Sequence, residues 1–178
     1  MIFGIQGSGK SVLLKYLLRC VPNHYVYDTL LEHSGYNRYK PTHSQKGNLQ
    51  LAQQELNLFV NKVILKEKPD LFAIDEINRY VKPNPSPLPD SIMKLNDWNR
   101  HYGIGFIGIA RRPTQVHSDL VELSHYLFFF RVGWRLDCEY LNQIREGLGD
   151  KVAQLPQYHF YFLANETGEL KLMRPVIL

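Results

Sequence analysis

The sequence lacks the features that mark disulfide-rich, metal-stabilised or membrane-spanning chains. Its two cysteines, Cys20 and Cys138, fit neither a zinc-ligand nor a redox spacing, so we expect two unpaired thiols. The seven histidines form no HExxH motif or similar cluster, so no structural metal site is predicted. No apolar run approaches the roughly 18–20 residues of a membrane span. The first residues enter a glycine-rich loop instead of a signal peptide, which predicts a cytoplasmic chain or one carried in a particle assembled there.

The bulk composition is that of a globular protein. Of the 178 residues, 44% are hydrophobic and 21% are charged, which is enough apolar material for one ordinary core. No break in composition divides the chain, so we expect a single domain over residues 1–178. The net charge of +4 is compatible with a nucleic-acid partner without requiring one.

Short apolar segments alternate with helical patterns, which favours an α/β fold with a mainly parallel central sheet flanked by helices. We expect strands at residues 1–3, 24–28, 71–74, 104–110 and 126–132, and a closing C-terminal hairpin at 159–163 and 170–173. We expect helices before Pro22 and over residues 49–66, 90–101, 114–124 and 137–147, with loops over 32–48 and 81–89.

The segment GIQGSGKS, residues 4–11, fits the phosphate-binding pattern G-x-x-x-x-G-K-[ST] in full. It follows an apolar strand and precedes an amphipathic helix, where backbone N–H groups and the helix dipole favour an anion. Lys10 is expected to reach the β- and γ-phosphates of ATP, and Ser11 to bind Mg²⁺. The predicted nucleotide-binding residues are Gly4, Gln6, Gly7, Ser8, Gly9, Lys10, Ser11 and Val12.

Two carboxylates follow the apolar segment LFAI, residues 71–74. In a parallel sheet they emerge at the edge where ligands bind, beside the loop of a neighbouring strand. We expect Asp75 to hold Mg²⁺ through water and Glu76 to orient or deprotonate the attacking water. Because an acid at the second position is typical of hydrolases, the pair predicts ATP hydrolysis.

Arginines end the next two predicted strands. Arg111, followed by Arg112, would lie near the γ-phosphate as a sensor of nucleotide state or as a finger in a neighbouring subunit. A solvated pair at a strand end is the alternative. Arg131 and, after it, Arg135 are candidates for an arginine supplied in trans, and Gln115 is a further polar candidate.

Taken together, these motifs resemble the FtsK–HerA superfamily of P-loop motor ATPases. The order of motifs corresponds: the phosphate loop, a strand ending in Asp28, a strand ending in Asp-Glu, and a strand ending in Arg-Pro. The segment GIGFIGIARRPTQVHSDLVELSHYLFFFR, residues 103–131, is similar to its counterpart in HerA-like ATPases. Many relatives carry glutamine where Arg111 stands, which leaves both the sensor and the finger role open for this arginine.

The resemblance implies a motor core that moves double-stranded DNA through a homo-oligomeric ring, a hexamer or a pentamer. Small members include the genome-packaging ATPases of membrane-containing icosahedral viruses, so capsid vertex proteins are expected partners. No N-terminal domain, membrane anchor or winged-helix tail is expected. The location would be the host cytoplasm or the virion.

Alternative functions are a HerA-like, phage-morphogenesis or secretion ATPase acting on protein or membrane partners, and a small-molecule kinase. Candidate DNA contacts are basic and aromatic loop residues, with ordinary exposed loop residues as the alternative: Tyr36, Arg38, Tyr39, Lys40, Arg79, Tyr80 and Lys82.

Overall fold

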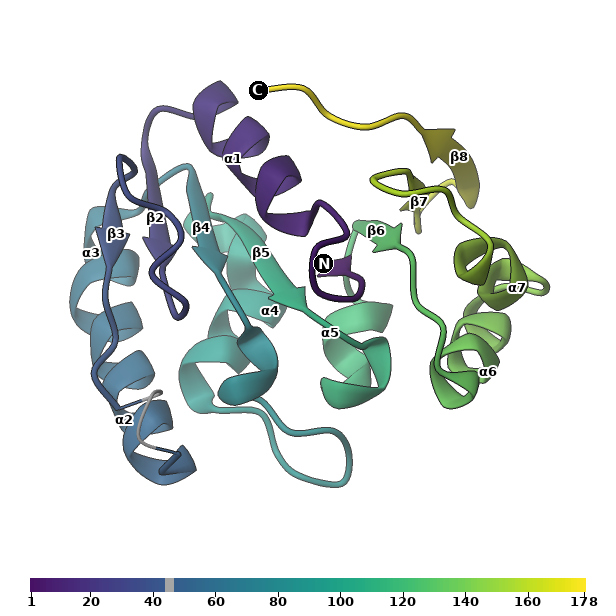
Figure 1. Ribbon diagram of the computed structural model, residues 1–178. Coiled ribbons are helices and arrows are strands. Elements are labelled where there is room, and N and C mark those ends of the chain that lie inside the picture. The colour runs from purple at the N-terminus through teal and green to yellow at the C-terminus, as the bar shows by residue number, and fades with distance from the viewer. Residues whose placement is uncertain (44–46) are drawn as a thin grey trace.

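An eight-stranded sheet forms the centre of the molecule, with strand order β3-β2-β4-β5-β1-β6-β7-β8 (Figure 1). The computed structural model describes residues 1–43 and 47–178. The strands are β1 Ile2–Phe3, β2 His24–Tyr27, β3 Arg38–Tyr39, β4 Leu71–Ile74, β5 Gly105–Ala110, β6 Tyr126–Phe130, β7 Phe160–Ala164 and β8 Glu169–Met173. Pairs from β3 to β6 are parallel, whereas β6, β7 and β8 pair antiparallel. The predicted α/β fold and C-terminal hairpin are confirmed.

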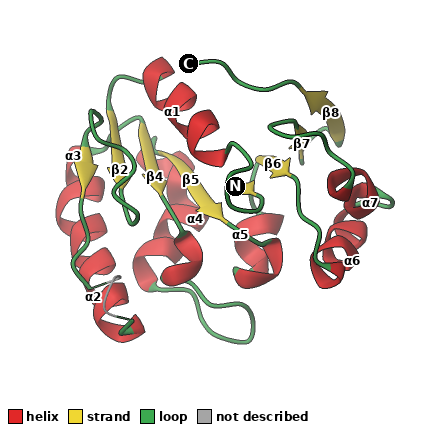
Figure 2. Ribbon diagram, in the orientation of Figure 1, coloured by secondary structure: helices red, strands yellow, loops and turns green. Residues whose placement is uncertain are grey.

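Helices cover both faces of this sheet (Figure 2). Helix α1 lies on one face, and α2, α4 and α5 lie on the other (Figure 1). Their bounds are α1 Lys10–Cys20, α2 Leu49–Phe59, α3 Leu65–Glu67, α4 Asp90–Tyr102, α5 Ser118–Glu122, α6 Arg135–Ile144 and α7 Leu148–Ala153.

Strand β4 consists only of apolar residues because both of its faces are covered. Leu71 and Ala73 pack in the cluster that contains the apolar residues of α1. Phe72 and Ile74 pack in the opposite cluster with α2 and α4. Because successive side chains point to opposite faces, a strand covered on both sides has no position left for a polar residue.

The predicted loop over residues 32–48 is wrong in part, because it contains β3. This edge strand pairs with β2 in parallel, and the Tyr39 ring stacks on Phe59 with centroids 4.4 Å apart. Because β3 has only two residues, it shows no alternation of apolar and polar side chains in the sequence, and the strand is recognised only from its packing. The part of the prediction over residues 44–46 lies outside the described residues.

Three predicted helices differ from the observed ones. Residues 49–66 form α2 and α3 with a π-helix, Val60–Ile64, between them, because one widened turn still keeps Val60 and Ile64 buried. Residues 114–124 divide into a 3-10 turn, Pro113–Gln115, and α5, because Val116 and His117 are extended and the His117 side chain caps α5 by accepting from the Asp119 N–H. Helix α6 begins and ends earlier than predicted, and α7 was not predicted.

The structure bears on the cysteines and on the possibility of a membrane-spanning helix. Cys20 and Cys138 are both free thiols, as predicted. Within residues 1–43 and 47–178, no helix combines the length and the apolar character needed to cross a bilayer.

The Glu55 carboxylate of α2 fixes the segment that follows β3. It accepts hydrogen bonds from the N–H groups of Thr42 and His43, at 3.0 and 2.9 Å, and from the Tyr39 hydroxyl at 2.9 Å. Burial alone would raise the pKa of Glu55, but these hydrogen bonds outweigh burial and lower the pKa from 4.5 to about 2. The ionised carboxylate is therefore the form that stabilises this corner.

We expect Glu55→Gln to lower the free energy of unfolding at pH 7 by about 1.5–3 kcal/mol, the range for hydrogen bonds to a charged group. Since the folded-state pKa lies below the unfolded one, the contribution is complete above pH 4.5 and is lost as the pH falls towards 2. Urea titrations followed by circular dichroism should show the wild type and the variant converging over that range. Glu166→Gln, in the exposed turn between β7 and β8, is the matched control. A constant difference between Glu55→Gln and the wild type at all pH values would contradict this account.

Candidate active site

The loop between β1 and α1 depends on glycines in left-handed conformations. Gly4 has φ +152° and Gly9 has φ +110°. A Cβ atom on Gly4 would lie 2.5 Å from the Phe130 Cβ, and one on Gly9 would lie 3.1 Å from the Phe130 ring. Gly9 immediately precedes α1. The first N–H groups of a helix have no partner within it, so the loop presents donors and positive helix dipole to an anion.

Two polar side chains of this loop face inward. The Lys10 ammonium, with only 8% of the residue exposed, donates to the Ile5 carbonyl across the loop at 2.9 Å. The buried Ser8 hydroxyl has no hydrogen-bond partner among the described residues. Burial lowers the pKa of Lys10, and Glu76 and Asp75 oppose that shift. The loop therefore holds a partly desolvated cation and an unsatisfied hydroxyl, a donor set that suits phosphate oxygens.

The carboxylates of Asp75 and Glu76 lie at the carboxyl end of β4, as predicted, and both residues are buried. One expectation is wrong: β4 does not adjoin the loop strand β1, because β5 pairs with both. Parallel strands bring their carboxyl ends to one edge, so the strand between them contributes its own residue there. That residue is Arg111.

Arg111 and Glu76 form an ion pair, with Arg111 Nε donating to Glu76 Oε1 at 2.9 Å. Glu76 has the left-handed φ of +54°, which is strained for a residue with a side chain. The structure thus brings together the expected water-activating carboxylate and the expected sensor, and holds them through a charge-assisted bond.

The adjacent arginine has a different environment. Arg112 Nε donates to the buried Asp137 carboxylate at 2.8 Å, and its guanidinium lies 5.0 Å from the Trp134 ring centroid. The Thr114 hydroxyl donates to the other Asp137 oxygen at 2.6 Å. Arg112 therefore fixes the start of α6, and only Arg111 contacts the site.

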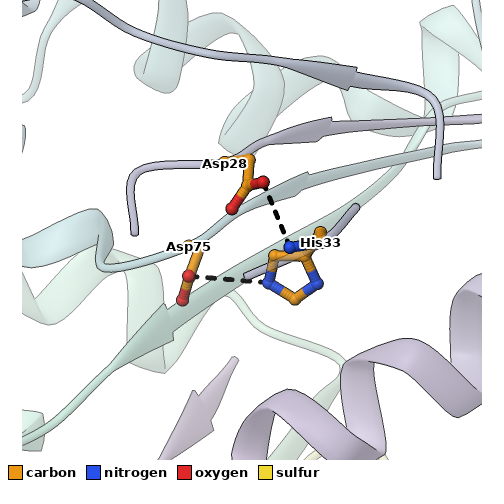
Figure 3. A group of neighbouring side chains, drawn as sticks. All are labelled: Asp28, His33 and Asp75. Atoms are coloured by element: carbon orange, nitrogen blue, oxygen red, sulfur yellow. Dashed lines mark hydrogen bonds and ion pairs between the residues drawn. The ribbon is translucent and has the colours of Figure 1, made fainter. Parts of the chain in front are cut away.

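The segment after β2 adds residues that sequence reasoning missed. The Ser11 hydroxyl donates to Glu32 Oε2 at 3.1 Å, and His33 Nε2 lies 3.5 Å from Asp75 Oδ2 (Figure 3). Glu32 and His33 belong to the predicted loop 32–48, where no motif distinguishes them from other polar residues. Asp28, noted only as a strand-ending acid, anchors both through its carboxylate.

Asp28, His33 and Asp75 place potential ligand atoms within 4.8 Å of one another (Figure 3). The predicted absence of a histidine cluster considered only sequence spacing, and the fold brings His33 between two acids. Arg38 already pairs with Asp28 at 2.6 Å, so a side-chain cation balances this carboxylate. Asp75 Oδ2 has no hydrogen-bond partner among the described residues, and this buried oxygen is suited to the magnesium shell expected of Asp75.

Two pockets flank the loop and share Tyr158. One, of about 260 Å³, is lined by Gly9, Val12, Phe130, Tyr158, Pro175 and Val176. The other, of about 250 Å³, is lined by Ile5, Gln6, Gly7, Ser8, Arg131, Gln157 and Tyr158. Val12 was expected to contact the nucleotide, whereas Tyr158 and the C-terminal residues carry no sequence signal. Arg131 lies beside its own chain's loop, where its carbonyl accepts from Ile5 N–H at 3.0 Å.

The structure excludes one of the candidate DNA contacts. Tyr80 is fully buried and shares a 2.9 Å hydrogen bond with Thr29, and Tyr39 packs on Phe59. Arg38 is engaged with Asp28. The prediction is wrong for Tyr80, which fills the core, and it stays a prediction for the half-buried Tyr39 and Arg38. The half-buried Tyr36 donates to the Lys15 carbonyl at 3.4 Å, whereas the candidates with exposed side chains are Lys40, Arg79 and Lys82.

No protein-family model matches the chain. It is similar to the crystal structure of B204, the DNA-packaging ATPase from Sulfolobus Turreted Icosahedral Virus, with a TM-score of 0.80 and 19% identity over 99% of this chain and 96% of that one. For the genome packaging NTPase B204 from Sulfolobus turreted icosahedral virus 2 in complex with AMP, the TM-score is 0.78 at 20% identity, over 99% and 96% of the chains. Structures of that protein with AMPPCP and ATP-gammaS are also similar.

By sequence, the chain is 22% identical over 105 residues to the probable DNA double-strand break repair helicase HerA of Methanocaldococcus jannaschii. This match covers 58% of the chain but only 21% of that helicase, so the chain spans about a fifth of its relative. Identities this low describe the fold, and the fold agrees along nearly the whole chain. The chain therefore has the fold of an FtsK–HerA-type P-loop ATPase.

Proposed function

We propose that the chain is a Mg²⁺-dependent ATPase. The observation that carries this proposal is the convergence of Lys10, Glu76 and Arg111 at one edge of the sheet. Lys10 would bind the β- and γ-phosphates, Glu76 would orient the attacking water, and Arg111 would sense the γ-phosphate. Ser11 and Asp75 would hold Mg²⁺, which neutralises phosphate charge when bound.

The nucleotide would span the glycine loop. Its phosphates would accept from the loop N–H groups, from Lys10 and from the unsatisfied Ser8 hydroxyl. The neighbouring pocket, with Val12, Tyr158 and Val176 in its lining, offers the apolar surfaces that suit a flat base. Gln6 and Gly7 line the second pocket on the other side of the loop.

Two contacts in the described structure would have to break when ATP binds. Lys10 must leave the Ile5 carbonyl, and Arg111 must release Glu76 to meet the γ-phosphate. Lys10 gains because a charge-assisted bond to phosphate is stronger than its bond to a neutral carbonyl, whereas Arg111 exchanges a carboxylate for the more highly charged phosphate. The exchange would free the Glu76 carboxylate for water only after the nucleotide is in place.

The mechanical function proposed is translocation of double-stranded DNA, packaging a viral genome into a preformed capsid. Support comes from similarity to the DNA-packaging ATPase B204 and, by sequence, to HerA. The net charge of +4 and the exposed Arg79 and Lys82, which follow Glu76 in the chain, suit sequence-independent phosphate contacts. Capsid vertex proteins would be partners, in the host cytoplasm or in the assembled virion.

A ring, a hexamer or a pentamer, would place a neighbour's arginine at each site. Arg131 is exposed but lines the pocket beside its own loop. The Arg135 side chain is 85% exposed and pairs only loosely with Glu139, at 3.5 Å. Arg135 is thus the better placed of the two to reach an adjacent subunit.

Lys10→Ala should reduce ATP turnover by about 100-fold or more, because one electrostatic stabiliser of the transferring phosphoryl group is removed. Glu76→Gln should retain ATP binding and slow hydrolysis by about 10²–10⁴-fold. Phosphate release and binding of a fluorescent ATP analogue measure the two effects, with Glu166→Gln as the matched carboxylate control. Wild-type turnover in Glu76→Gln would refute the role given to this residue.

Double-stranded DNA should stimulate turnover at low salt. In Arg79→Ala/Lys82→Ala, DNA affinity should fall and the logarithmic salt slope should shrink by about 1 for each lost phosphate contact. The control is Lys66→Ala/Lys151→Ala, which removes equal charge, with Lys66 near the amino end of β4. If wild-type chain neither binds DNA nor responds to it at low salt, a protein- or membrane-directed ATPase is favoured instead.

Substitutions of Arg111 and Arg112 should affect stability and ATP turnover differently. Arg112→Ala leaves the buried Asp137 without its cation and should cost about 1–3 kcal/mol of unfolding free energy, after allowance for the partly exposed guanidinium. Arg111→Ala removes a 40% exposed guanidinium from the buried Glu76 carboxylate, so it should cost less stability than Arg112→Ala, and it should reduce turnover by roughly 10–100-fold. Urea unfolding and phosphate release distinguish them. Equal losses of stability would mean that Arg111 is also structural.

A further inference from the structure

We propose that Glu32 is a second direct protein ligand of the nucleotide-associated Mg²⁺, beside Ser11, while Asp75 holds the ion through water. The inference rests on the proposed ATPase function and deepens it, because it assigns a role to the segment between β2 and β3. No sequence motif marks Glu32, whose contacts are with Ser11 and, through its backbone N–H, Asp28.

The first contact is the hydrogen bond from Ser11 Oγ to Glu32 Oε2, 3.1 Å long. In an octahedral magnesium shell with bonds of about 2.1 Å, adjacent oxygens lie about 3.0 Å apart. The two oxygens therefore already have the separation of neighbouring ligands. Carboxylate and hydroxyl oxygens are also the donor types that Mg²⁺ prefers.

Glu32 is held in this position by a buried anchor. The fully buried Asp28 carboxylate accepts from the N–H groups of Glu32 and His33, at 3.0 and 3.1 Å, and pairs with Arg38. Leu31, one residue earlier, has the strained φ of +62°. A strained turn persists when surrounding bonds over-determine it, so the Glu32 carboxylate is presented by a fixed turn.

The next residue reaches Asp75, which is expected to hold Mg²⁺ through water. His33 is fully buried, and its Nε2 lies 3.5 Å from Asp75 Oδ2 (Figure 3). Neither ring nitrogen of His33, nor Asp75 Oδ2, has a hydrogen-bond partner among the described residues. His33 would help to orient the Asp75 carboxylate, as outer-shell groups do for residues that hold a metal. Consecutive residues of one turn thus contact both Ser11 and Asp75.

The charges near the loop give a reason for a third acid. Glu32, Asp75 and Glu76 all lie close enough to Lys10 to raise its pKa, against the larger lowering by burial. Without a cation, these carboxylates repel the phosphates of ATP. With Mg²⁺ between them, Glu32 becomes an attractive contact, so this residue should make nucleotide affinity depend strongly on metal.

Two alternative roles of Glu32 predict different changes in nucleotide affinity. If Glu32 only blocks Ser11 in the nucleotide-free chain, its removal should strengthen nucleotide binding equally with and without Mg²⁺. If Glu32 only supports the turn, its removal should change neither affinity. Metal ligation alone predicts a loss confined to the metal-containing condition.

The experiment measures the affinity of a fluorescent ATP analogue in EDTA and in saturating Mg²⁺, for wild type, Glu32→Gln and the control Glu166→Gln. We expect the Mg²⁺-to-EDTA affinity ratio to fall by about 10-fold or more in Glu32→Gln. Affinity in EDTA should be unchanged or higher, because a negative charge near the phosphates is removed.

A second measurement is independent of affinity and turnover. Electron paramagnetic resonance of Mn²⁺ with a non-hydrolysable ATP analogue in ¹⁷O-water counts metal-bound waters, and Glu32→Gln should gain one relative to wild type. An unchanged water count together with an unchanged affinity ratio would overturn the proposal, as would equal strengthening in both conditions. A wild-type chain that binds no nucleotide in either condition would overturn the proposed ATPase itself, and this inference with it.

Discussion

Parallel pairing of β4, β5 and β1 is the constraint on which the site depends. Ile74 pairs with Gly108, and Ala110 pairs with Phe3, so the three strands end at one edge within a few residues of each other. Strands β1 and β4 and the last three residues of β5 are buried, so the strands cannot slip in register without exposing apolar side chains. The functional residues follow the last paired positions directly. Their separation is therefore set by the sheet, and loops contribute only the final placement.

Charge balance is the second organising constraint. Three buried acids have arginine partners: Asp28 with Arg38, Asp137 with Arg112, and Glu76 with Arg111. All three carboxylates are buried, but within the part of the chain that the structure describes only those of the first two pairs are also bound by N–H or hydroxyl donors, so these two pairs are structural. The third lies at the mouth of the site with a 40% exposed guanidinium. An arriving anion can compete for that arginine at little cost to the fold, which separates a switchable ion pair from fixed ones.

Several features could be predicted from sequence because short-range chemistry determines them. Phosphate binding by residues 4–11 requires glycines, a lysine and a helix start within a few positions, so a sequence motif identifies the loop. Asp75 and Glu76 follow a run of four apolar residues, which predicts a covered strand and an acid at its end. The C-terminal hairpin, β7 and β8, follows from two apolar segments around a short turn. Each signal is contained in one element and its immediate flanks.

Tertiary structure decided what depends on contacts between distant segments. Arg111 and Arg112 are adjacent and chemically equivalent in sequence, and only packing sends one to Glu76 and the other to Asp137. Glu32 lies 21 residues after its partner Ser11 in the chain, and Tyr158 lies much further from the loop whose pocket it lines. Neither residue belongs to a recognisable motif. Local propensity carries no information on which side chains meet when strands pair out of chain order. The sequence thus determined the chemistry of the loop and its acids, and the strand order determined their partners.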